Sequence, residues 1–254
     1  MSEKDDLRGQ TIVFTGHPKS NEALLEVERL GGKVKVFPLI QTQEITSQDE
    51  IVLAKLNTYD WLIFTSQNAV MAFEQKLKRH KVNRDSLKSK VAAVGSKTAE
   101  ALQKSGFQVL FTPTIFSADV FVQQFPKVTN HLETCLFVKG SLAKATITIG
   151  LPQQVDEWTV YETLPDANTA QELLTYVKQH HKLVIAFASP SAVEVFAREI
   201  ASVTGWDRYR TAAIGHVTAD ALKTHEALVH VQPETYTWLA LVQQIALRKD
   251  DLQL

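Results

Sequence analysis

Three segments in the first half of the chain recur, in the same order, in the second half. The matched pairs are FTSQNAVMAF (64–73) with FASPSAVEVF (187–196), VAAVGSKTAEAL (91–102) with TAAIGHVTADAL (211–222), and PTIFSADVFVQQF (113–125) with PETYTWLALVQQI (233–245). The middle pair is identical at seven of its twelve positions. Three ordered matches indicate one ancestral unit used twice, and two similar lobes predict a cleft between them that binds a ligand.

Short runs rich in Val, Ile and Phe alternate with segments of helical pattern. After the first run, Leu24, Val27 and Leu30 are spaced to form one apolar helix face. Several of the runs are apolar throughout, which is typical of parallel strands covered on both faces. Because ten strands are many for one sheet, the pattern predicts two parallel five-stranded sheets. The runs lie at 11–15, 33–37, 61–65, 91–94, 108–111, 135–138, 158–161, 183–187, 211–214 and 228–231.

Two stretches interrupt this alternation. Residues 38–48 are polar and read as extended chain, and residues 162–169 are similar and contain Pro165. Both are typical of places where a chain crosses between lobes. In that case the middle section forms one complete domain, and the two ends together form the other. A simple tandem split near residue 130 is the alternative that the pattern leaves open.

Composition excludes several functional classes. The formal net charge of the 254-residue chain is -1, which gives no general footprint for nucleic acid or acidic membranes. The first ten residues show no signal peptide, and no run approaches the roughly 18 apolar residues of a membrane span. The single cysteine, Cys135, cannot form an internal disulfide. We therefore expect a cytoplasmic protein, and the lack of a large apolar stripe favours a monomer.

The repeated motifs fall where a strand ends and a helix begins. Ser66 and Ser189 hold equivalent places after two apolar runs, and Thr98 and Thr218 follow Gly-containing turns after two others. Such residues cap helices in any fold. In open parallel sheets, however, ligands bind outside the carboxyl ends of the strands, where helix starts offer N–H groups to anions. The turns therefore predict a site for a ligand with several negative groups.

Sequence signatures of other sites are missing. The chain has no P-loop, GxGxxG, GxSxG or HExxH motif, so neither a cofactor nor a metal is implied. His17, Lys19, Lys139 and Lys144 follow strands and either meet carboxylates or are ordinary surface residues. Tyr161 ends an apolar run just before the second crossing, where it is either a packed aromatic or a phenol that faces the cleft.

These motifs resemble the uroporphyrinogen-III synthase family over nearly the whole chain. Each matching segment is weakly specific, but their order and spacing together are fairly specific. The segments are DWLIFTSQNAV (60–70), VAAVGSKTAEAL (91–102) with Gly106, FTPTIFSADVFV (111–122), LFVKG (136–140), VDEWTVYET (155–163), IAFASPSAVEVF (185–196), IGHVTADAL (214–222) and QPETYTWL (232–239).

The resemblance implies two flavodoxin-like α/β lobes joined by a two-stranded linker, with one lobe inserted in the other. One lobe then comprises residues 1–38 plus 168–254, the other residues 46–160, and the crossings are 39–45 and 161–167. It also implies that hydroxymethylbilane is cyclised to uroporphyrinogen III without a cofactor, with Tyr161 assisting loss of the substrate hydroxyl. The predicted substrate-binding residues are Ser66, Gln67, Thr98, Lys139, Ser189, Ser191, Thr218, Thr235 and His17.

The sequence departs from the family at four places. His17 stands near the position of a common Thr-Arg-Pro arginine, the segment after Gly140 lacks an arginine, Ala188 replaces a common Thr, and Glu226 replaces a glycine that usually follows the helix. Two alternatives therefore stay open, a two-lobed anion-binding protein without catalysis and a family member that has lost activity. The expected partner is the linear tetrapyrrole, handed over by the upstream enzyme that makes it.

Overall fold

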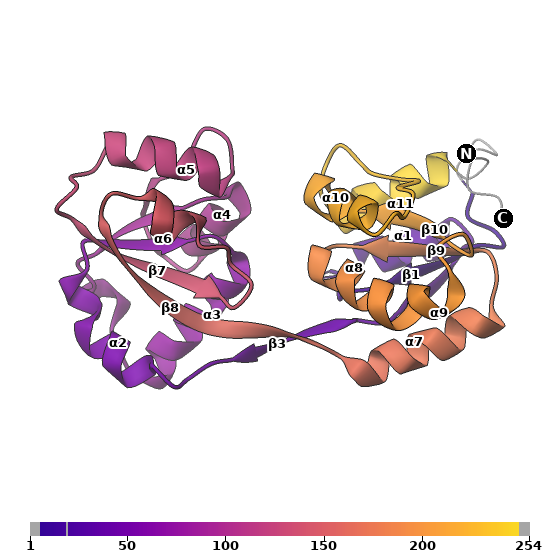
Figure 1. Cartoon of the computed structure of the whole chain (residues 1–254), viewed down its shortest axis with the longest axis horizontal. Coiled ribbons are helices and arrows are strands. Elements are labelled where there is room, and N and C mark those ends of the chain that lie inside the picture. The colour runs from indigo at the N-terminus through magenta and orange to yellow at the C-terminus, as the bar shows by residue number, and fades with distance from the viewer. Residues whose placement is uncertain (1–5, 19, 249–254) are drawn as a thin grey trace. The chain divides into compact units, whose positions relative to one another are not determined.

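The chain divides into two compact units, which share a fold but are built from different parts of the sequence (Figure 1). The computed structural model describes residues 6–18 and 20–248, so Lys19 lies outside the described residues. Unit 1 contains the described residues up to Gln41 and from Leu164 onward, and unit 2 runs from Thr42 to Thr163. In the described part of the chain, no helix is both long and apolar enough to cross a membrane.

Unit 1 has a four-stranded parallel sheet in the order β10-β9-β1-β2. Ile12 in β1 pairs with Val34 on one side and Val184 on the other. Every residue of β1 and β9 is buried, as expected for central strands covered on both faces. The strands are β1 (Thr11–Phe14), β2 (Lys33–Val36), β9 (Leu183–Phe187) and β10 (Arg210–Ala213).

Helices cover both faces of this sheet. Because side chains alternate along a strand, Val13 joins one apolar cluster while Ile12 and Phe14 join the other. The first cluster includes side chains of α7 (Ala167–Gln179), α8 (Pro190–Phe196) and α10 (His216–Thr224); the second includes those of α1 (Glu22–Arg29) and α11 (Trp238–Leu247). After α8 the chain continues as a π-helix (Ala197–Ala201) and α9 (Ser202–Thr204).

Unit 2 has a six-stranded sheet in the order β3-β8-β7-β4-β5-β6. Its five strands from β8 to β6 are parallel. The amide of Ile45 donates to the Val160 carbonyl and that of Asp166 to the Leu39 carbonyl, an opposite residue order that makes β3 antiparallel to β8. The strands are β3 (Ile40–Glu44), β4 (Trp61–Phe64), β5 (Lys90–Ala93), β6 (Val109–Phe111), β7 (Thr134–Gly140) and β8 (Gln154–Pro165).

The faces of the second sheet are covered in the same way. Leu62 and Phe64 of β4 contribute to one apolar cluster and Trp61 and Ile63 to the other. The first cluster includes side chains of α3 (Gln67–Arg79) and α4 (Ser96–Lys104), with α2 (Asp49–Lys55) at its margin; the second includes those of α5 (Ala118–Gln124) and α6 (Thr146–Gly150). Short 3₁₀ helices lie at Leu56–Thr58, Arg84–Ser86 and Phe125–Lys127.

The two sheets have equivalent strand orders once the repeat is taken into account. In sequence order unit 1 contributes β1, β2, β9 and β10, which lie in the flavodoxin-like arrangement 2-1-3-4. In unit 2 the neighbouring strands are β8, β7, β4 and β5, in that order. If β7 is numbered 1, β8 2, β4 3 and β5 4, this is the same arrangement 2-1-3-4. Each copy of the repeat is therefore divided between the units.

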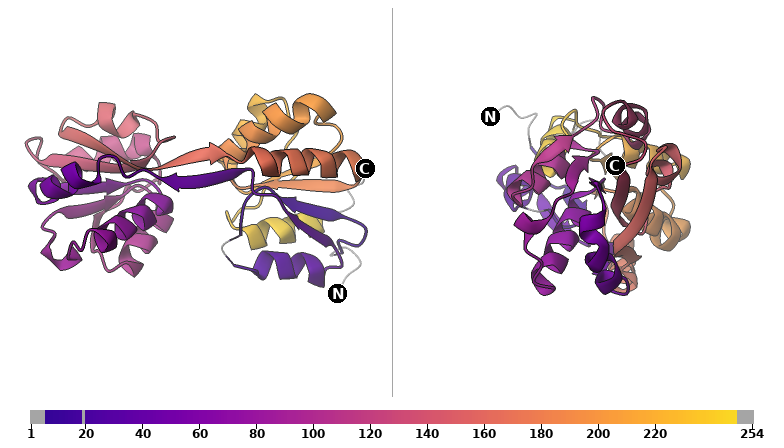
Figure 2. Two further views of the ribbon diagram at one scale, coloured as in Figure 1. Left: turned by 90° about the horizontal axis from the view of Figure 1, so that it is seen from below. Right: turned by 90° about the vertical axis from the view of Figure 1, so that its left-hand side faces the viewer.

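The predicted count of five strands in each sheet is wrong. Residues 228–231 form only an isolated bridge between Val231 and Ala212, because the amides of His230 and Val231 both donate to one carbonyl, that of Thr211. Unit 2 gains a strand, β3, because polar residues 40–44 pair with β8. Both stretches expected as crossings, 39–45 and 161–167, thus contribute to paired strands, which lie side by side in Figure 1 and in the left view of Figure 2.

Candidate functional site

The carboxyl ends of the unit 2 strands bring several predicted site residues to one edge of the sheet. Ser66 and Gln67 follow β4, Thr98 lies in the helix that follows β5, and Gly140 ends β7. Tyr161 of β8 is in register with Gly140 and lies level with the others. We call these residues the unit 2 edge. Ligands of open α/β sheets bind at this end of the strands.

Ser66 is the N-cap of α3. Its backbone is extended, with φ -144° and ψ 149°, and its Oγ accepts a hydrogen bond of 3.1 Å from the Ala69 amide. This bond satisfies one of the amides that a helix start leaves without a partner. The Ser66 hydroxyl therefore lies at a fixed place on the unit 2 edge.

The phenol of Tyr161 contacts this cap directly. Its Oη lies 3.2 Å from Ser66 Oγ, within hydrogen-bond distance. The Tyr161 ring packs against the apolar cluster under α3, while the residue as a whole is only half-buried. The ring of Tyr161 is thus packed and its phenol lies beside a polar group, while a phenol that faces a cleft stays a prediction.

Gly140 gives the Tyr161 ring its place. A β-carbon on Gly140 would lie 2.4 Å from the ring carbon Cζ and 2.6 Å from Oη, closer than any real contact. The Ser141 amide donates to the Tyr161 carbonyl over 2.9 Å and fixes the two strand ends together. This contact could not be predicted from the sequence, although Gly140 and Tyr161 both lie in segments that resemble the family.

Lys139 is directed into unit 2. The residue is 9% exposed, and its Nζ lies 2.8 Å from Glu157 Oε2 on the neighbouring strand. Hydrogen bonds from Lys139 and from Thr148 hold the pKa of the Glu157 carboxyl below its ordinary value. The charge of Lys139 is therefore balanced within the unit. Glu157 could not be predicted from the sequence, because Glu157 and Lys139 become neighbours only when β8 pairs with β7.

Thr98 and Gln67 complete the predicted set in unit 2. Thr98 is 4% exposed and its amide donates to the Gly95 carbonyl at the start of α4. If Gly95 carried a β-carbon, the nearest atom to it would be Thr98 Oγ1, at 3.8 Å. Gln67 is the first residue of α3 and partly exposed, directly after Ser66.

The corresponding edge of unit 1 carries the other predicted residues. Ser189 caps α8 by accepting from the Ala192 amide at 3.3 Å, and its Oγ lies 3.1 Å from Ser191 Oγ. Thr218 is buried in the first turn of α10. His17 and Thr235 are exposed in the loops after β1 and before α11.

A tyrosine–histidine pair on the same edge of unit 1 was missed. Tyr236 Oη lies 3.0 Å from His216 Nδ1, and the Tyr236 ring would be 3.0 Å from a β-carbon on Gly215. Tyr236 is the repeat equivalent of Phe116, and both side chains are more than half exposed. The matched segments at 113–125 and 233–245 contain these aromatics, so the repeat itself was the available signal.

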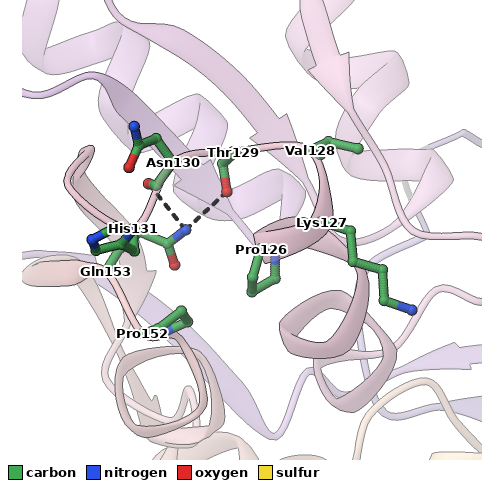
Figure 3. A pocket seen from close by; sticks show the side chains of 8 residues that line it. All are labelled: Pro126, Lys127, Val128, Thr129, Asn130, His131, Pro152 and Gln153. Atoms are coloured by element: carbon green, nitrogen blue, oxygen red, sulfur yellow. Dashed lines mark hydrogen bonds between the residues drawn. The ribbon is translucent and has the colours of Figure 1, made fainter.

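A surface hollow of about 580 Å³ lies at the other end of the unit 2 sheet (Figure 3). It is formed by the segments that precede β7 and β8, so it is separated from the unit 2 edge by the length of the strands. Gln153 donates from Nε2 to Thr129 Oγ1 at 2.8 Å and to the Asn130 carbonyl at 3.4 Å there. The hollow holds none of the predicted site residues.

Within residues 6–18 and 20–248, no group of three or more His, Cys, Asp or Glu side chains is arranged to hold a metal ion. Burial raises the pKa of the Cys135 thiol to about 12, so this residue is a core side chain and a poor nucleophile.

The sequence comparisons with known proteins identify the family. The family model described as uroporphyrinogen-III synthase HemD matches residues 21–243. A uroporphyrinogen-III synthase of Chlorobaculum parvum is 29% identical over 93% of this chain and 98% of its own length. The enzyme of the same name from Synechococcus elongatus is 28% identical over 91% of this chain and 92% of its own length.

Solved structures show the likeness of fold. A mutant uroporphyrinogen III synthase from Thermus thermophilus matches with a TM-score of 0.72 at 18% identity, over 95% of this chain and 100% of that chain. The uroporphyrinogen-III synthetase of Helicobacter pylori matches with a TM-score of 0.65 at 20% identity, over 94% and 99% of the two chains.

Proposed function

The chain belongs to the uroporphyrinogen-III synthase family, and we propose that it cyclises hydroxymethylbilane to uroporphyrinogen III in tetrapyrrole biosynthesis. It is then a cyclising lyase that removes water and needs no cofactor. The observation that carries the catalytic part of this proposal is the Tyr161 phenol, which lies 3.2 Å from Ser66 Oγ at the carboxyl ends of the unit 2 strands.

The reaction requires control of geometry more than strong acid or base groups. Loss of the terminal hydroxyl gives an azafulvene, and attack on it by the substituted carbon of ring D gives a spiro intermediate. Reclosure then inverts ring D, whereas simple closure gives the type I isomer. Holding reacting groups in one geometry can lower a barrier by roughly 7–11 kcal/mol. A site of fixed hydroxyl and amide groups suits this task.

Tyr161 is the proposed proton donor to the leaving hydroxyl. A phenol can donate one hydrogen bond and accept others, so it can stabilise the departing oxygen without being ionised beforehand. The half-buried position of Tyr161 leaves part of the side chain accessible from solvent. Its ring is held by Gly140 and its oxygen by Ser66, which supports a directed donor.

The substrate carboxylates are proposed to bind at helix starts. N–H groups and the positive end of the helix dipole favour anions there without a formal charge on the protein. Ser66, Gln67, Thr98 and Lys139 would serve in unit 2, and Ser189, Ser191, Thr218, Thr235 and His17 in unit 1. Because Lys139 is paired with Glu157, we expect its contribution to be weaker than that of an unpaired cation.

The decisive experiment is incubation with freshly prepared hydroxymethylbilane, followed by separation of the type I and type III products. An excess of type III over the uncatalysed mixture supports the proposal. A protein that binds the bilane but leaves the product ratio unchanged is a binding protein without catalysis. A protein that does neither is a family member that has lost activity.

We further propose that the enzyme acts as a monomer in the cytoplasm and receives its substrate by hand-over from the enzyme that makes it. The support for hand-over is chemical, because free hydroxymethylbilane closes by itself to the wrong isomer. Sedimentation at micromolar concentrations tests whether the protein is a monomer. Dilution of a coupled assay tests hand-over, since a substrate passed directly between the two enzymes gives a type III fraction that does not fall on dilution.

A further inference from the structure

The position of Tyr161 depends on two neighbours with different physical roles. Gly140 removes a steric obstacle, since any β-carbon there would lie 2.4 Å from ring carbon Cζ of Tyr161. Gly140 pairs with Tyr161 just after a shift in register between β7 and β8, and its φ is not positive, so alanine would be tolerated by the backbone itself. The requirement for glycine at this position therefore arises from the Tyr161 ring.

The hydrogen bond between Ser66 and the phenol can run in either direction, since each hydroxyl can donate or accept. A hydroxyl has one hydrogen to donate and two lone pairs that accept. One lone pair of Ser66 Oγ already accepts from the Ala69 amide at 3.1 Å, while its hydrogen has no partner other than Tyr161 Oη among the described residues. If Ser66 donates to Tyr161, the phenolic hydrogen is left for a bound oxygen.

We propose that Ser66 and Gly140 are positioning residues for Tyr161, Gly140 by admitting the ring and Ser66 by donating to the phenol so that its hydrogen points to the ligand. The inference rests on the proposed function for the identity of that ligand, the leaving hydroxyl of the tetrapyrrole. The arrangement of the three residues does not rest on it. The positioning inference and the proposed function can therefore fail separately.

The first measurement needs no substrate. The chain has five tyrosines, and replacing them with 3-fluorotyrosine gives ¹⁹F resonances, of which that of Tyr161 is identified by its loss in Tyr161→Phe. We expect the Tyr161 resonance to shift in Gly140→Ala and in Ser66→Ala. Gly16→Ala is the matched glycine control, because a β-carbon at this repeat-equivalent position is 3.7 Å from its nearest neighbour, Trp238.

The second measurement is kinetic. Misplacing a reacting group by about 1 Å can cost 10²-fold in rate, so we expect kcat to fall about 100-fold in Gly140→Ala and about 10-fold in Ser66→Ala. KM should change less than about threefold in both, since positioning affects the chemical step more than binding and the carboxylate contacts proposed for Ser66 are shared with several other helix starts. Ser66→Thr keeps a hydroxyl and should retain kcat within about threefold.

Loss of the helix cap is controlled separately. Ser117 caps α5 in the same unit by accepting from the Val120 amide at 3.2 Å, and among the described residues its hydroxyl makes no hydrogen bond to a phenol. Ser117→Ala should lower stability as much as Ser66→Ala, by about 1 kcal/mol, without shifting the Tyr161 resonance.

The outcomes separate the two proposals. If the Tyr161 resonance stays in place in both Gly140→Ala and Ser66→Ala, the positioning inference is overturned, whatever the activity. If it shifts while kcat is unchanged, the positioning role in catalysis is also overturned. If the wild-type protein forms no excess type III product, the proposed function fails, and the fluorine spectra still decide whether Ser66 and Gly140 hold the ring. A Gly140→Ala chain that does not fold leaves Ser66→Ala and Ser66→Thr to decide.

Discussion

In unit 1 the buried polar side chains that the structure describes are neutral, whereas unit 2 buries charged ones. The unit 1 set is Gln10, Thr11, Thr15, Thr211 and Thr218, and the unit 2 set is Asp49, Lys76, Thr98, Lys139 and Gln153. At equivalent positions of the repeat, Thr15 donates to the Ala186 carbonyl, while Lys139 pairs with Glu157. Two copies of one fold thus differ mainly in polar chemistry, because the apolar packing must be kept in both.

The same contrast holds at the carboxyl ends of the strands. Ser66 and Ser189 are equivalent caps, but Ser66 contacts the phenol of Tyr161 and Ser189 contacts Ser191. Gly140 lies under a ring, while its equivalent Gly16 has only ordinary contact distance to its neighbour. The repeated residues hold helices in both units, and the unrepeated ones bring the proposed chemistry to unit 2.

The largest effect we expect comes from Lys76, the fully buried cation of unit 2. Its Nζ lies 2.7 Å from Asp49 and 3.1 Å from Glu44, and it also donates to the Ile45 carbonyl, so it ties α3 to β3 and α2. Lys76→Met leaves the buried Asp49 without its nearest cation, with only His80 at 3.5 Å and Arg79 at 4.0 Å beside it, and should lower the free energy of unfolding by roughly 3–5 kcal/mol. Urea titration measures the loss, and hydrogen exchange should locate it in unit 2.

Two variants control the Lys76 prediction. Lys78→Met removes an exposed lysine from the same helix and should change stability by less than about 0.5 kcal/mol. Adding Asp49→Asn to Lys76→Met should recover part of the loss, because the uncompensated charge is gone. Equal losses of stability in Lys76→Met and Lys78→Met would mean that the buried ion pairs of Lys76 do not set unit 2 apart from unit 1.

The next effect concerns activity and compares the two tyrosines. Tyr161→Phe removes the proposed donor and should lower kcat for type III product by about 10²-fold, as for loss of a general acid. Tyr236→Phe removes the phenol at the corresponding edge of unit 1 and its bond to His216, and we expect kcat to stay within about threefold. Coupled assays with freshly made hydroxymethylbilane give both numbers, and circular dichroism checks folding. Unchanged turnover in Tyr161→Phe would remove Tyr161 from the mechanism.

Much of the fold follows from local patterns in the sequence. The apolar runs, the repeat and the caps at Ser66 and Ser189 are local features, so they predicted parallel α/β sheets and helix starts. The strand counts required knowledge of pairing, which is not local. Residues 40–44 pair with β8 despite their polar pattern, and His230 and Val231 share one carbonyl, which interrupts a fifth strand in unit 1.

The site was predictable in part for the same reason. Ser66 and Tyr161 are 95 positions apart in sequence and meet through strand order and register. The ion pair of Lys139 with Glu157 arises in the same way, since the two residues are diagonal neighbours on adjacent strands. Which residues lie at strand ends could be read from the sequence, but their partners could not.

Acid should weaken the two units at different pH values. Burial, and then the charge of Arg210, lower the pKa of His230 in folded unit 1. As the pH falls, the His230 imidazole takes up a proton at a higher pH in the unfolded chain than in the folded one. Unit 1 therefore loses stability as the pH falls through about 6.5. In unit 2, bonds from Arg79 to Glu44 and from Lys139 to Glu157 lower the pKa of each carboxyl, so their stabilisation is lost only as the pH falls below about 4.5.

Hydrogen exchange between pH 7 and pH 5 tests this order after correction for the intrinsic exchange rate. Peptides from unit 1 should lose protection first, and His230→Asn, which cannot titrate, should reduce that loss. If protection falls first in unit 2, or if His230→Asn has the same pH profile as the wild type, the assignment to His230 is wrong.

The smallest effect we expect is at the ends of two equivalent helices. After α4, Gly106 has φ +80°, and after α10 Glu226 occupies the same place with φ +58°. In both, this residue and the next donate to the last turn of the helix, the amide of Phe107 to Leu102 and that of Ala227 to Leu222.

A left-handed backbone costs a residue with a β-carbon roughly 1 kcal/mol relative to glycine, so Glu226→Gly should stabilise the chain by about 0.5–1 kcal/mol. Glu226→Ala removes the same charge but keeps the β-carbon, and it should give no comparable gain. Urea midpoints at constant slope measure both. An equal gain in the two variants would assign the effect to the charge of Glu226. A gain in Glu226→Gly alone would show that unit 1 keeps a conformational strain that its counterpart in unit 2 avoids with Gly106.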